Sequence, residues 1–113
     1  MADDCFFCRM VSGAIPVSKV AENEHCLAFR DIAPQAPTHV LVIPKAHVAT
    51  LNDVADYALI GHLSAMAAEV ARLEGIADGG YRTVINTNRD GGQTVFHLHM
   101  HVLGGRHMTW PPG

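Results

Sequence analysis

The chain has 113 residues, three cysteines and a formal net charge of −3, which is enough sequence for one domain spanning residues 1–113. Hydrophobic residues make up 49% of it and charged residues 17%, so the composition is globular rather than disordered. The acidic balance argues against a nucleic-acid partner, and no run of about 20 apolar residues is available to span a membrane.

The cysteine count and the N-terminal residues indicate a compartment. An odd number of cysteines argues against a secreted disulfide framework. The opening MADDCFFCRM is acidic and lacks the basic start and the apolar run of a signal peptide. We therefore expect a cytoplasmic protein.

The pattern along the chain predicts an α+β fold. A short helix is possible over FFCRMVSG, and a helix is predicted over 54–74, with Asn52 or Asp53 at its start and Gly75 at its end. One stripe of that helix is apolar: Leu59, Leu63, Met66, Val70 and Leu73. Strands are predicted over 26–30, 38–44, 81–86 and 95–103. This order favours an antiparallel sheet of about five strands with the long helix packed on one face.

The segment HLHMHVL, residues 97–103, alternates histidine with apolar residues. In a strand, the apolar residues from Phe96 to Val102 would face the core, and the three histidines would share the other face. At about 3.3 Å per residue, the Cα atoms of His97 and His101 would lie roughly 13 Å apart, too far to share one metal ion easily. The histidines therefore have separate roles, unless they form a solvated face of an edge strand.

A glycine-rich loop, NTNRDGGQT, comes directly before these histidines. Gly91 and Gly92 allow a positive φ and a close approach of the backbone to a ligand. An anion there would be held by backbone N–H groups and by the side chains of Gln93 and Thr94. The loop is not a P-loop, and an ordinary hairpin turn is the alternative interpretation.

Taken together, these segments resemble one family. GGQTVFHLHMHVLGGR resembles the signature of the histidine triad (HIT) superfamily, and AFRDIAPQAPTHVLVIPKAH, GYRTVINTNRDGG and WPPG look like its Hint-type branch, the nucleotide-binding phosphoramidases. The resemblance covers roughly residues 5–113. It implies a HIT-like fold and a homodimer with a continuous sheet. It also implies cleavage of the P–N bond of purine nucleoside 5′-phosphoramidates, and of aminoacyl or lysyl adenylates, with release of AMP or GMP.

The resemblance also assigns catalytic roles. His99, the middle histidine, would attack phosphorus and form a nucleotidyl-histidine intermediate that water then hydrolyses. His101 and His39 would lie beside it and stabilise phosphoryl charge. Thr94 would pass a proton to the leaving amine or bind a phosphate oxygen. A neutral imidazole is a competent nucleophile near pH 7, and no cofactor is required for this chemistry.

Nucleoside binding follows from the same resemblance. Asp31 would accept both ribose hydroxyls, although it could equally be a turn residue at a strand end. Four apolar residues resemble those that sandwich the base and would otherwise be core: Phe7, Met10, Phe29 and Ile32. Asn86 would lie near the phosphate or ribose, beside Gly92 and Gln93.

Two departures from the Hint-type pattern keep alternatives open. Thr94 stands where serine is common, and QTV is reminiscent of the Fhit-type dinucleoside polyphosphate hydrolases, although Gly104 and Gly105 stand where that branch typically has proline. The alternatives are therefore a Fhit-type hydrolase, a nucleotide-binding regulator with incidental hydrolysis, or a zinc-binding structural module.

The second departure is the pair Cys5 and Cys8. Some family members with this pair resemble a structural zinc centre completed by residues like His47 and His97, and mixed thiolate and imidazole ligation suits zinc. Free thiols or a disulfide are the alternatives. Near the C-terminus, Trp110 would anchor the tail across the dimer or pack at the surface.

Overall fold

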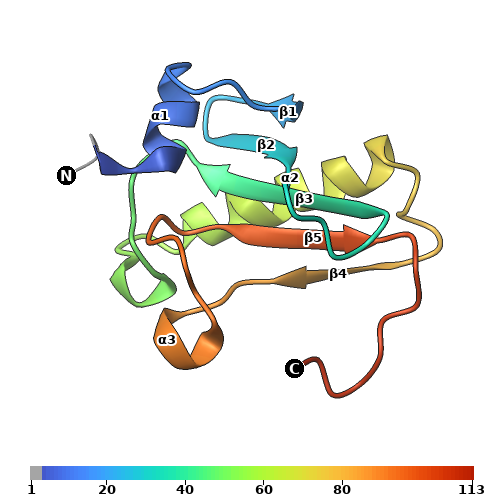
Figure 1. The fold of residues 1–113 in the computed structure, drawn as a ribbon. Helices are drawn as coiled ribbons and strands as arrows, with labels where there is room; N and C mark the ends of the chain where they lie inside the picture. The colour runs from blue at the N-terminus through green and yellow to red at the C-terminus, as the bar shows by residue number, and fades with distance from the viewer. Residues whose placement is uncertain (1–3) are drawn as a thin grey trace.

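The computed structural model describes residues 4–113, so the first three residues of the expected domain lie outside it. Its centre is a five-stranded antiparallel sheet in the order β1-β2-β3-β5-β4 (Figure 1). The strands are β1 (Lys19–Glu22), β2 (Cys26–Arg30), β3 (Thr38–Pro44), β4 (Tyr81–Val84) and β5 (Met100–Gly104). The helices are α1 (Phe6–Ser12), α2 (Ala58–Leu73) and α3 (Asn88–Gly91). The predicted α+β architecture is confirmed.

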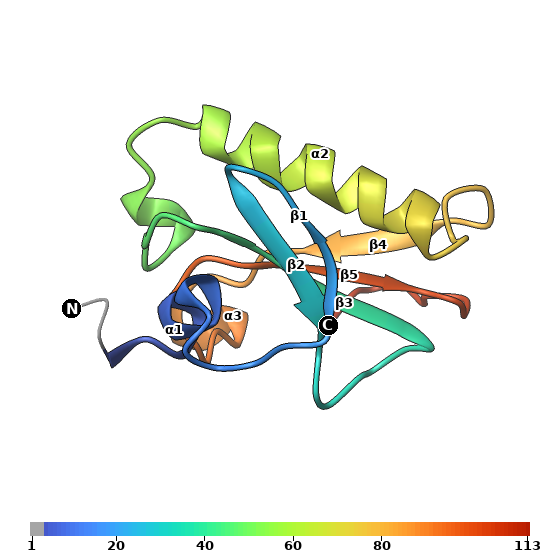
Figure 2. The same cartoon turned by 90° about the horizontal axis from the view of Figure 1, so that it is seen from above.

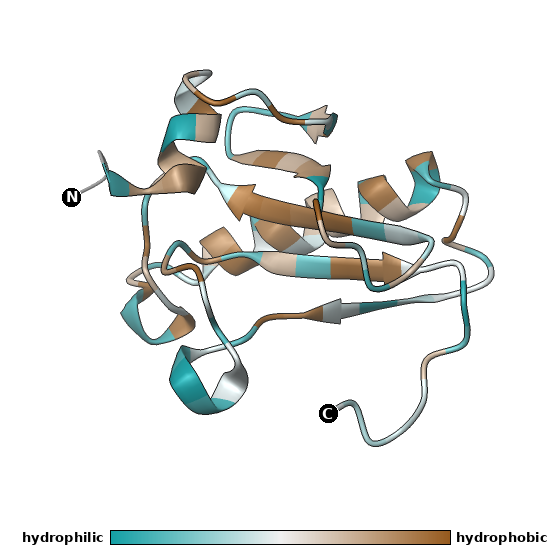
Figure 3. Ribbon diagram, in the orientation of Figure 1, coloured by the Kyte–Doolittle hydropathy of each residue, from teal (hydrophilic) through white to brown (hydrophobic). Residues whose placement is uncertain are grey.

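Strand β3 is the centre of the sheet and is buried along its whole length. Successive side chains of a strand point to opposite faces. Val40 and Val42 pack in the core under α2, whereas Leu41 and Ile43 pack on the opposite face with Phe7 of α1. In Figure 3 the strands β2 and β3 are mostly brown, the colour of hydrophobic residues, and α3 is mostly teal.

Helix α2 covers one face of the sheet, and α1 and α3 lie on the other side (Figure 2). Its predicted stripe is largely confirmed, because Leu63, Met66 and Val70 are buried, but Leu73 is 56% exposed. The predicted start at residue 54 is wrong. Residues Leu51–Asp53 form a separate 3-10 helix whose capping box joins Thr50 and Asp53, so neither Asn52 nor Asp53 begins α2.

The end of α2 agrees with the prediction. Gly75 follows the last turn and has a φ of +72°, a conformation that favours glycine. Residues 23–25 join β1 to β2, and the Asn23 carboxamide oxygen accepts the N–H groups of His25 and Cys26. Strand β1 itself was not among the predicted strands.

The strand predicted over 95–103 begins only at Met100, which pairs with Val42. Before Met100 the chain leaves the β3 ladder, because the N–H of Leu98 bonds to the carbonyl of Val48 at 2.7 Å instead. Phe96 is half-exposed rather than in the core. The strict alternation of faces therefore holds only from Met100 onward.

The strand predicted over 81–86 is confirmed for Tyr81–Val84, and the polar loop after it contains the short helix α3. Within residues 4–113 no helix combines the length and the apolar character that crossing a bilayer would require.

Candidate active site

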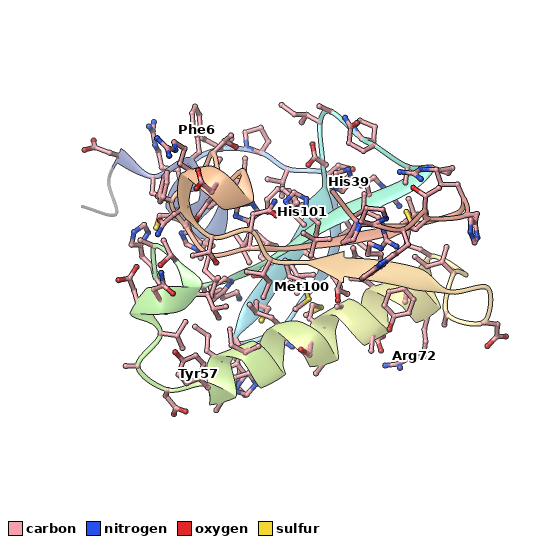
Figure 4. All side chains as sticks on the ribbon, turned by 90° about the horizontal axis from the view of Figure 1, so that it is seen from below. Phe6, His39, Tyr57, Arg72, Met100 and His101 are labelled. Atoms are coloured by element: carbon pink, nitrogen blue, oxygen red, sulfur yellow. The ribbon has the colours of Figure 1, made fainter. Side chains whose placement is uncertain are left out.

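A pocket of about 650 Å³ lies on the face of the sheet opposite α2. Figure 4 shows His39 and His101 on this side, whereas Met100 points toward α2. The difference follows from strand alternation: Leu41 pairs with His101, and both side chains face away from the helix. The lining residues are Phe6, Phe7, Met10, Ile15, Pro16, Val17, Ser18, Phe29, Arg30, Asp31, Ile32, Leu41, Thr94, Val95, His99 and His101.

All four residues predicted to sandwich a base line this pocket. Phe7 and Phe29 are buried and meet edge to face at 5.5 Å between ring centroids. Phe7 also meets the His99 ring edge to face at 5.3 Å. Met10 is half-buried, and Ile32 is fully exposed on the rim. The structure thus gives the pocket an apolar floor, with Ile32 open to a ligand at its edge.

Asp31 lies where β2 ends and lines the same pocket. Its Oδ1 accepts the N–H of Ala33 at 2.8 Å, which is the turn-forming role allowed by the sequence. Its Oδ2 lies 3.4 Å from Nε2 of His39. One carboxylate therefore shapes the loop and also faces the histidines.

His99 is buried and its two ring nitrogens are not equivalent. Nδ1 lies 2.8 Å from the main-chain carbonyl oxygen of His97. A carbonyl oxygen can only accept, so Nδ1 carries a hydrogen, and in the neutral ring the lone pair is on Nε2. Because His99 lines the pocket and its Nδ1 is engaged by the main chain, Nε2 is the ring nitrogen left for a ligand.

His39 and His101 form a second pair. Nε2 of His39 lies 2.9 Å from Nδ1 of His101, although His39 itself is not among the lining residues. Burial is the main cause that lowers the pKa of His101 to about 4, and His99 and His39 lower this pKa in smaller amounts. Burial also lowers the pKa of His39, and the charge of Asp31 opposes this shift. Both imidazoles are therefore neutral at pH 7.

Cys5, Cys8, His47 and His97 form a separate cluster whose four ligand atoms all lie within 4.8 Å of one another. His97 is fully buried, and its Nε2 donates to the carbonyl of Pro44 at 2.8 Å. Its Nδ1 is therefore unprotonated and lies 3.3 Å from Sγ of Cys5 and 3.2 Å from Nδ1 of His47. Two thiols and two imidazoles within this distance fit a metal ion.

In the structure the residues of the glycine loop make hydrogen bonds within the chain, and the anion site expected there stays a prediction. Gln93 is buried, its Nε2 donates to the carbonyls of Ala49 and Val95, and its Oε1 accepts the N–H of Asn88. The N–H groups of Gly92 and Gln93 close the C-terminal end of α3. Asn86, Gly92 and Gln93 do not line the pocket, whereas Thr94 is exposed and does.

Sequence reasoning did not find several pocket residues. Leu41 of β3, Val17 and Ser18 before β1, and Phe6 of α1 also form the wall. Their residue types are ordinary for a core or a surface loop, so no motif signals them. They come together because α1 packs over the end of the sheet (Figure 2).

Comparison with known proteins agrees with this geometry. The HIT domain family matches residues 12–108. The chain belongs to the HIT domain family. Cys5 and Cys8 lie outside the matched residues, so the family match itself does not include the thiols of the four-residue cluster.

Individual relatives of the HIT family cover nearly the whole chain. A HIT-like protein of Synechococcus elongatus is 51% identical over 100% of both chains. The purine nucleoside phosphoramidase of Escherichia coli is 47% identical over 94% of this chain and 91% of its own. The crystal structure of a HIT family hydrolase from Legionella pneumophila is 53% identical, with a TM-score of 0.93 over 96% of this chain and 99% of that one. The resemblance found in the sequence is confirmed at the level of family and fold.

Proposed function

We propose that this HIT protein is a hydrolase that cleaves the P–N bond of purine nucleoside 5′-phosphoramidates through a covalent intermediate on His99. The observation that carries the proposal is the hydrogen bond from Nδ1 of His99 to the carbonyl of His97, which leaves Nε2 as the available ring nitrogen of a residue that lines the pocket. The name of the E. coli relative, 47% identical, supports the same substrate class. Aminoacyl and lysyl adenylates are proposed as further substrates.

The proposed binding mode follows the shape of the pocket. The purine enters the apolar part formed by Phe7, Met10, Phe29 and Ile32, which line one pocket with Asp31. The Asp31 carboxylate accepts hydrogen bonds from the ribose hydroxyls. This places the 5′-phosphate toward His99, His101 and Thr94, which line the same pocket.

The chemistry takes two steps. The Nε2 lone pair of His99 forms a bond to phosphorus while the P–N bond breaks, and the leaving amine takes up one proton through the Thr94 hydroxyl. Nδ1–H of His99 stays bonded to the His97 carbonyl, which stabilises the charge on the ring. Water then attacks phosphorus and gives one proton back to the Thr94 oxygen, the Nε2–P bond breaks and restores the His99 lone pair, and AMP or GMP leaves. The N–H of His101 stabilises the phosphoryl oxygens.

Replacement of His99 by alanine tests this proposal. Release of AMP from an adenosine phosphoramidate is expected to fall by at least ~10³-fold, because the covalent route is lost. His107→Ala is the matched control, since His107 is exposed and has no assigned role. Undiminished turnover in His99→Ala would exclude the proposal, and tight AMP binding without turnover in the wild type would favour a nucleotide-binding regulator.

Thr94 and the segment QTV leave a Fhit-type hydrolase as the alternative. An assay on a dinucleoside polyphosphate beside the phosphoramidate distinguishes the two activities. The wild-type enzyme is expected to have the higher kcat/KM on the phosphoramidate. A higher kcat/KM on a diadenosine polyphosphate would assign the chain to that activity instead.

We also propose that Cys5, Cys8, His47 and His97 hold a structural zinc ion. The support is the position of their donor atoms within 4.8 Å of one another and the unprotonated Nδ1 of His97. Zinc would tie the N-terminal segment to the residue whose carbonyl orients His99. It would take no part in the chemical steps.

A further inference from the structure

We infer that Gln35 and Arg106 are positioning residues, and that the main-chain amide of Gln35 fixes the proton arrangement that makes His101 an Nε2–H donor toward the pocket. The inference rests on the proposed function for its kinetic consequence, but the proton arrangement is independent of any substrate. Neither residue lines the pocket, so both act through His39.

The first contact is a hydrogen bond whose donor is a main-chain N–H group, which can donate but cannot accept. The main-chain N–H of Gln35 donates to Nδ1 of His39 at 3.0 Å. A backbone amide cannot accept, so Nδ1 of His39 is unprotonated and its hydrogen is on Nε2. The backbone of the loop, rather than a side chain, therefore selects the tautomer of His39.

The next contact makes the tautomer of His101 depend on that of His39. Nε2 of His39 lies 2.9 Å from Nδ1 of His101 and 3.4 Å from Oδ2 of Asp31. Two N–H groups cannot face each other at hydrogen-bond distance, so Nδ1 of His101 must be the acceptor. The only hydrogen on the His101 ring is then on Nε2, the nitrogen left for the pocket that His101 lines.

The Gln35 peptide is held from its other side as well. Nε of Arg106 donates to the Gln35 carbonyl at 3.1 Å, and the Gln35 side-chain Nε2 donates to the carbonyl of Ala33 at 3.0 Å. Arg106 follows Gly105, which has a φ of +90° and lies so close to the loop that an added Cβ would be 2.9 Å from Cβ of Pro37. The segment after β5 therefore contacts the loop around Gln35 at two points and holds the Gln35 main-chain amide in place.

This arrangement gives His101 the form that the proposed chemistry needs. A neutral imidazole with Nε2–H can donate to a phosphoryl oxygen, whereas the other tautomer would present a lone pair to a negative group. The lowered pKa of both histidines agrees with neutral rings at pH 7. The N···N separation of 2.9 Å also indicates a shared hydrogen rather than a metal ion between His39 and His101.

Imidazole ¹⁵N NMR of the full chain tests the inference directly. In the wild type at pH 7, Nδ1 of both His39 and His101 should show the shift of an unprotonated nitrogen, and Nε2 that of a protonated one. Gln35→Pro removes the amide hydrogen, so the His101 nitrogens should move toward the average of two exchanging tautomers. Gln35→Ala keeps that hydrogen and should keep the wild-type pattern.

Kinetics provide the second measurement. Gln35→Pro is expected to lower kcat on the phosphoramidate about tenfold with KM within about twofold, because the lost donor acts in the transition state. Arg106→Ala, at an exposed position where folding is not at risk, is expected to lower kcat about threefold, on the order of one hydrogen bond. Arg82→Ala, which loses a similar bond to the Thr109 carbonyl, is the matched control and should not change kcat.

Two results would overturn the inference: a protonated Nδ1 on His39 in the wild type, or wild-type tautomers in Gln35→Pro. If Gln35→Pro does not fold, the wild-type spectrum and the kcat of Arg106→Ala decide the question. If the wild type shows no hydrolysis, the proposed function fails, while the spectra still decide the tautomers.

Discussion

At the scale of single residues, the three histidines of HLHMHVL differ in which ring nitrogen is already bound and in whether that nitrogen donates or accepts. His97 donates from Nε2 to Pro44, and His99 donates from Nδ1 to His97. His101 accepts at Nδ1 from His39. Under the proposed function, one residue type therefore supplies a ligand nitrogen, a nucleophile and a hydrogen-bond donor. The partner of each ring nitrogen depends on the path of the backbone around it, which the amino-acid sequence does not show directly.

The lowered pKa of His101 predicts a dependence of stability on pH. Its folded-state pKa of about 4 lies below the ordinary 6.5, so the unfolded chain takes up the proton first as the pH falls. The contribution to stability is complete above pH 6.5 and is lost between pH 6.5 and 4, by at most about 3 kcal/mol. Urea unfolding of the wild type should therefore weaken over this range more than that of His101→Gln. Parallel pH profiles would contradict the prediction.

At the scale of elements, the hydrophobic periodicity predicted which segments form helices and strands more accurately than it predicted where each helix or strand begins and ends. β2 and β3 occupy their predicted ranges, because a run of β-branched and apolar residues between turns has few alternatives. The ends of α2 and β5 depend on tertiary contacts, such as the bond from Leu98 N–H to the Val48 carbonyl that takes His97 and His99 out of the ladder.

Two glycine substitutions should change stability in opposite directions. Gly61 lies within α2, with nothing within 4 Å of an added Cβ, so Gly61→Ala is expected to stabilise the fold by about 0.5–1 kcal/mol. Gly105→Ala would meet Pro37 at a φ of +90° and is expected to cost roughly 1–2 kcal/mol. Denaturant midpoints at constant m-value measure both. Equal shifts in the two variants would contradict the structural reason.

Two of the four residues in the cluster, Cys5 and Cys8, belong to α1 or its cap, so we expect metal binding to stabilise this helix. The protein is expected to retain one zinc ion per chain after dialysis, and Cys5→Ser is expected to lose it, because the cluster then lacks one thiolate. The thermal midpoint should fall by about 5 °C or more. Cys26→Ala, which removes a buried thiol outside the cluster, should keep the metal. Elemental analysis of the three proteins measures the stoichiometry, and zinc-free wild type would refute the prediction.

At the scale of the whole molecule, the two edges of the sheet differ in charge. β1 carries Lys19 and Glu22, which pair at 2.9 Å, and Glu22 also pairs with Lys45 at 2.7 Å. Charged side chains at an edge strand disfavour pairing with another chain. β4 is less protected, and beside it the tail is held by the bond from Arg82 to the Thr109 carbonyl. Trp110 in that tail is 81% exposed on its own chain.

The homodimer implied by the sequence therefore remains a prediction, and β4 is the edge at which we expect it. Sedimentation at micromolar concentration should give about twice the 12.2 kDa of one chain. Thr83→Lys, at an exposed position of β4, should shift the protein toward the monomer. Lys19→Ala at the opposite edge is the control and should leave the mass unchanged. A wild-type mass of one chain would exclude the dimer.

By itself the sequence determined the family, the α+β class and half of the pocket residues, because apolar periodicity and family motifs such as HLHMHVL are readable in the linear sequence. The separation of the histidines into two clusters was also correct, although the straight strand used to argue it does not extend back to His97. Only the tertiary structure decided the proton positions, the structural use of Gln93 and the clamp by Arg106. These features depend on contacts between residues that are distant in the chain, or on the direction in which one backbone group points. A local sequence pattern specifies neither kind of contact.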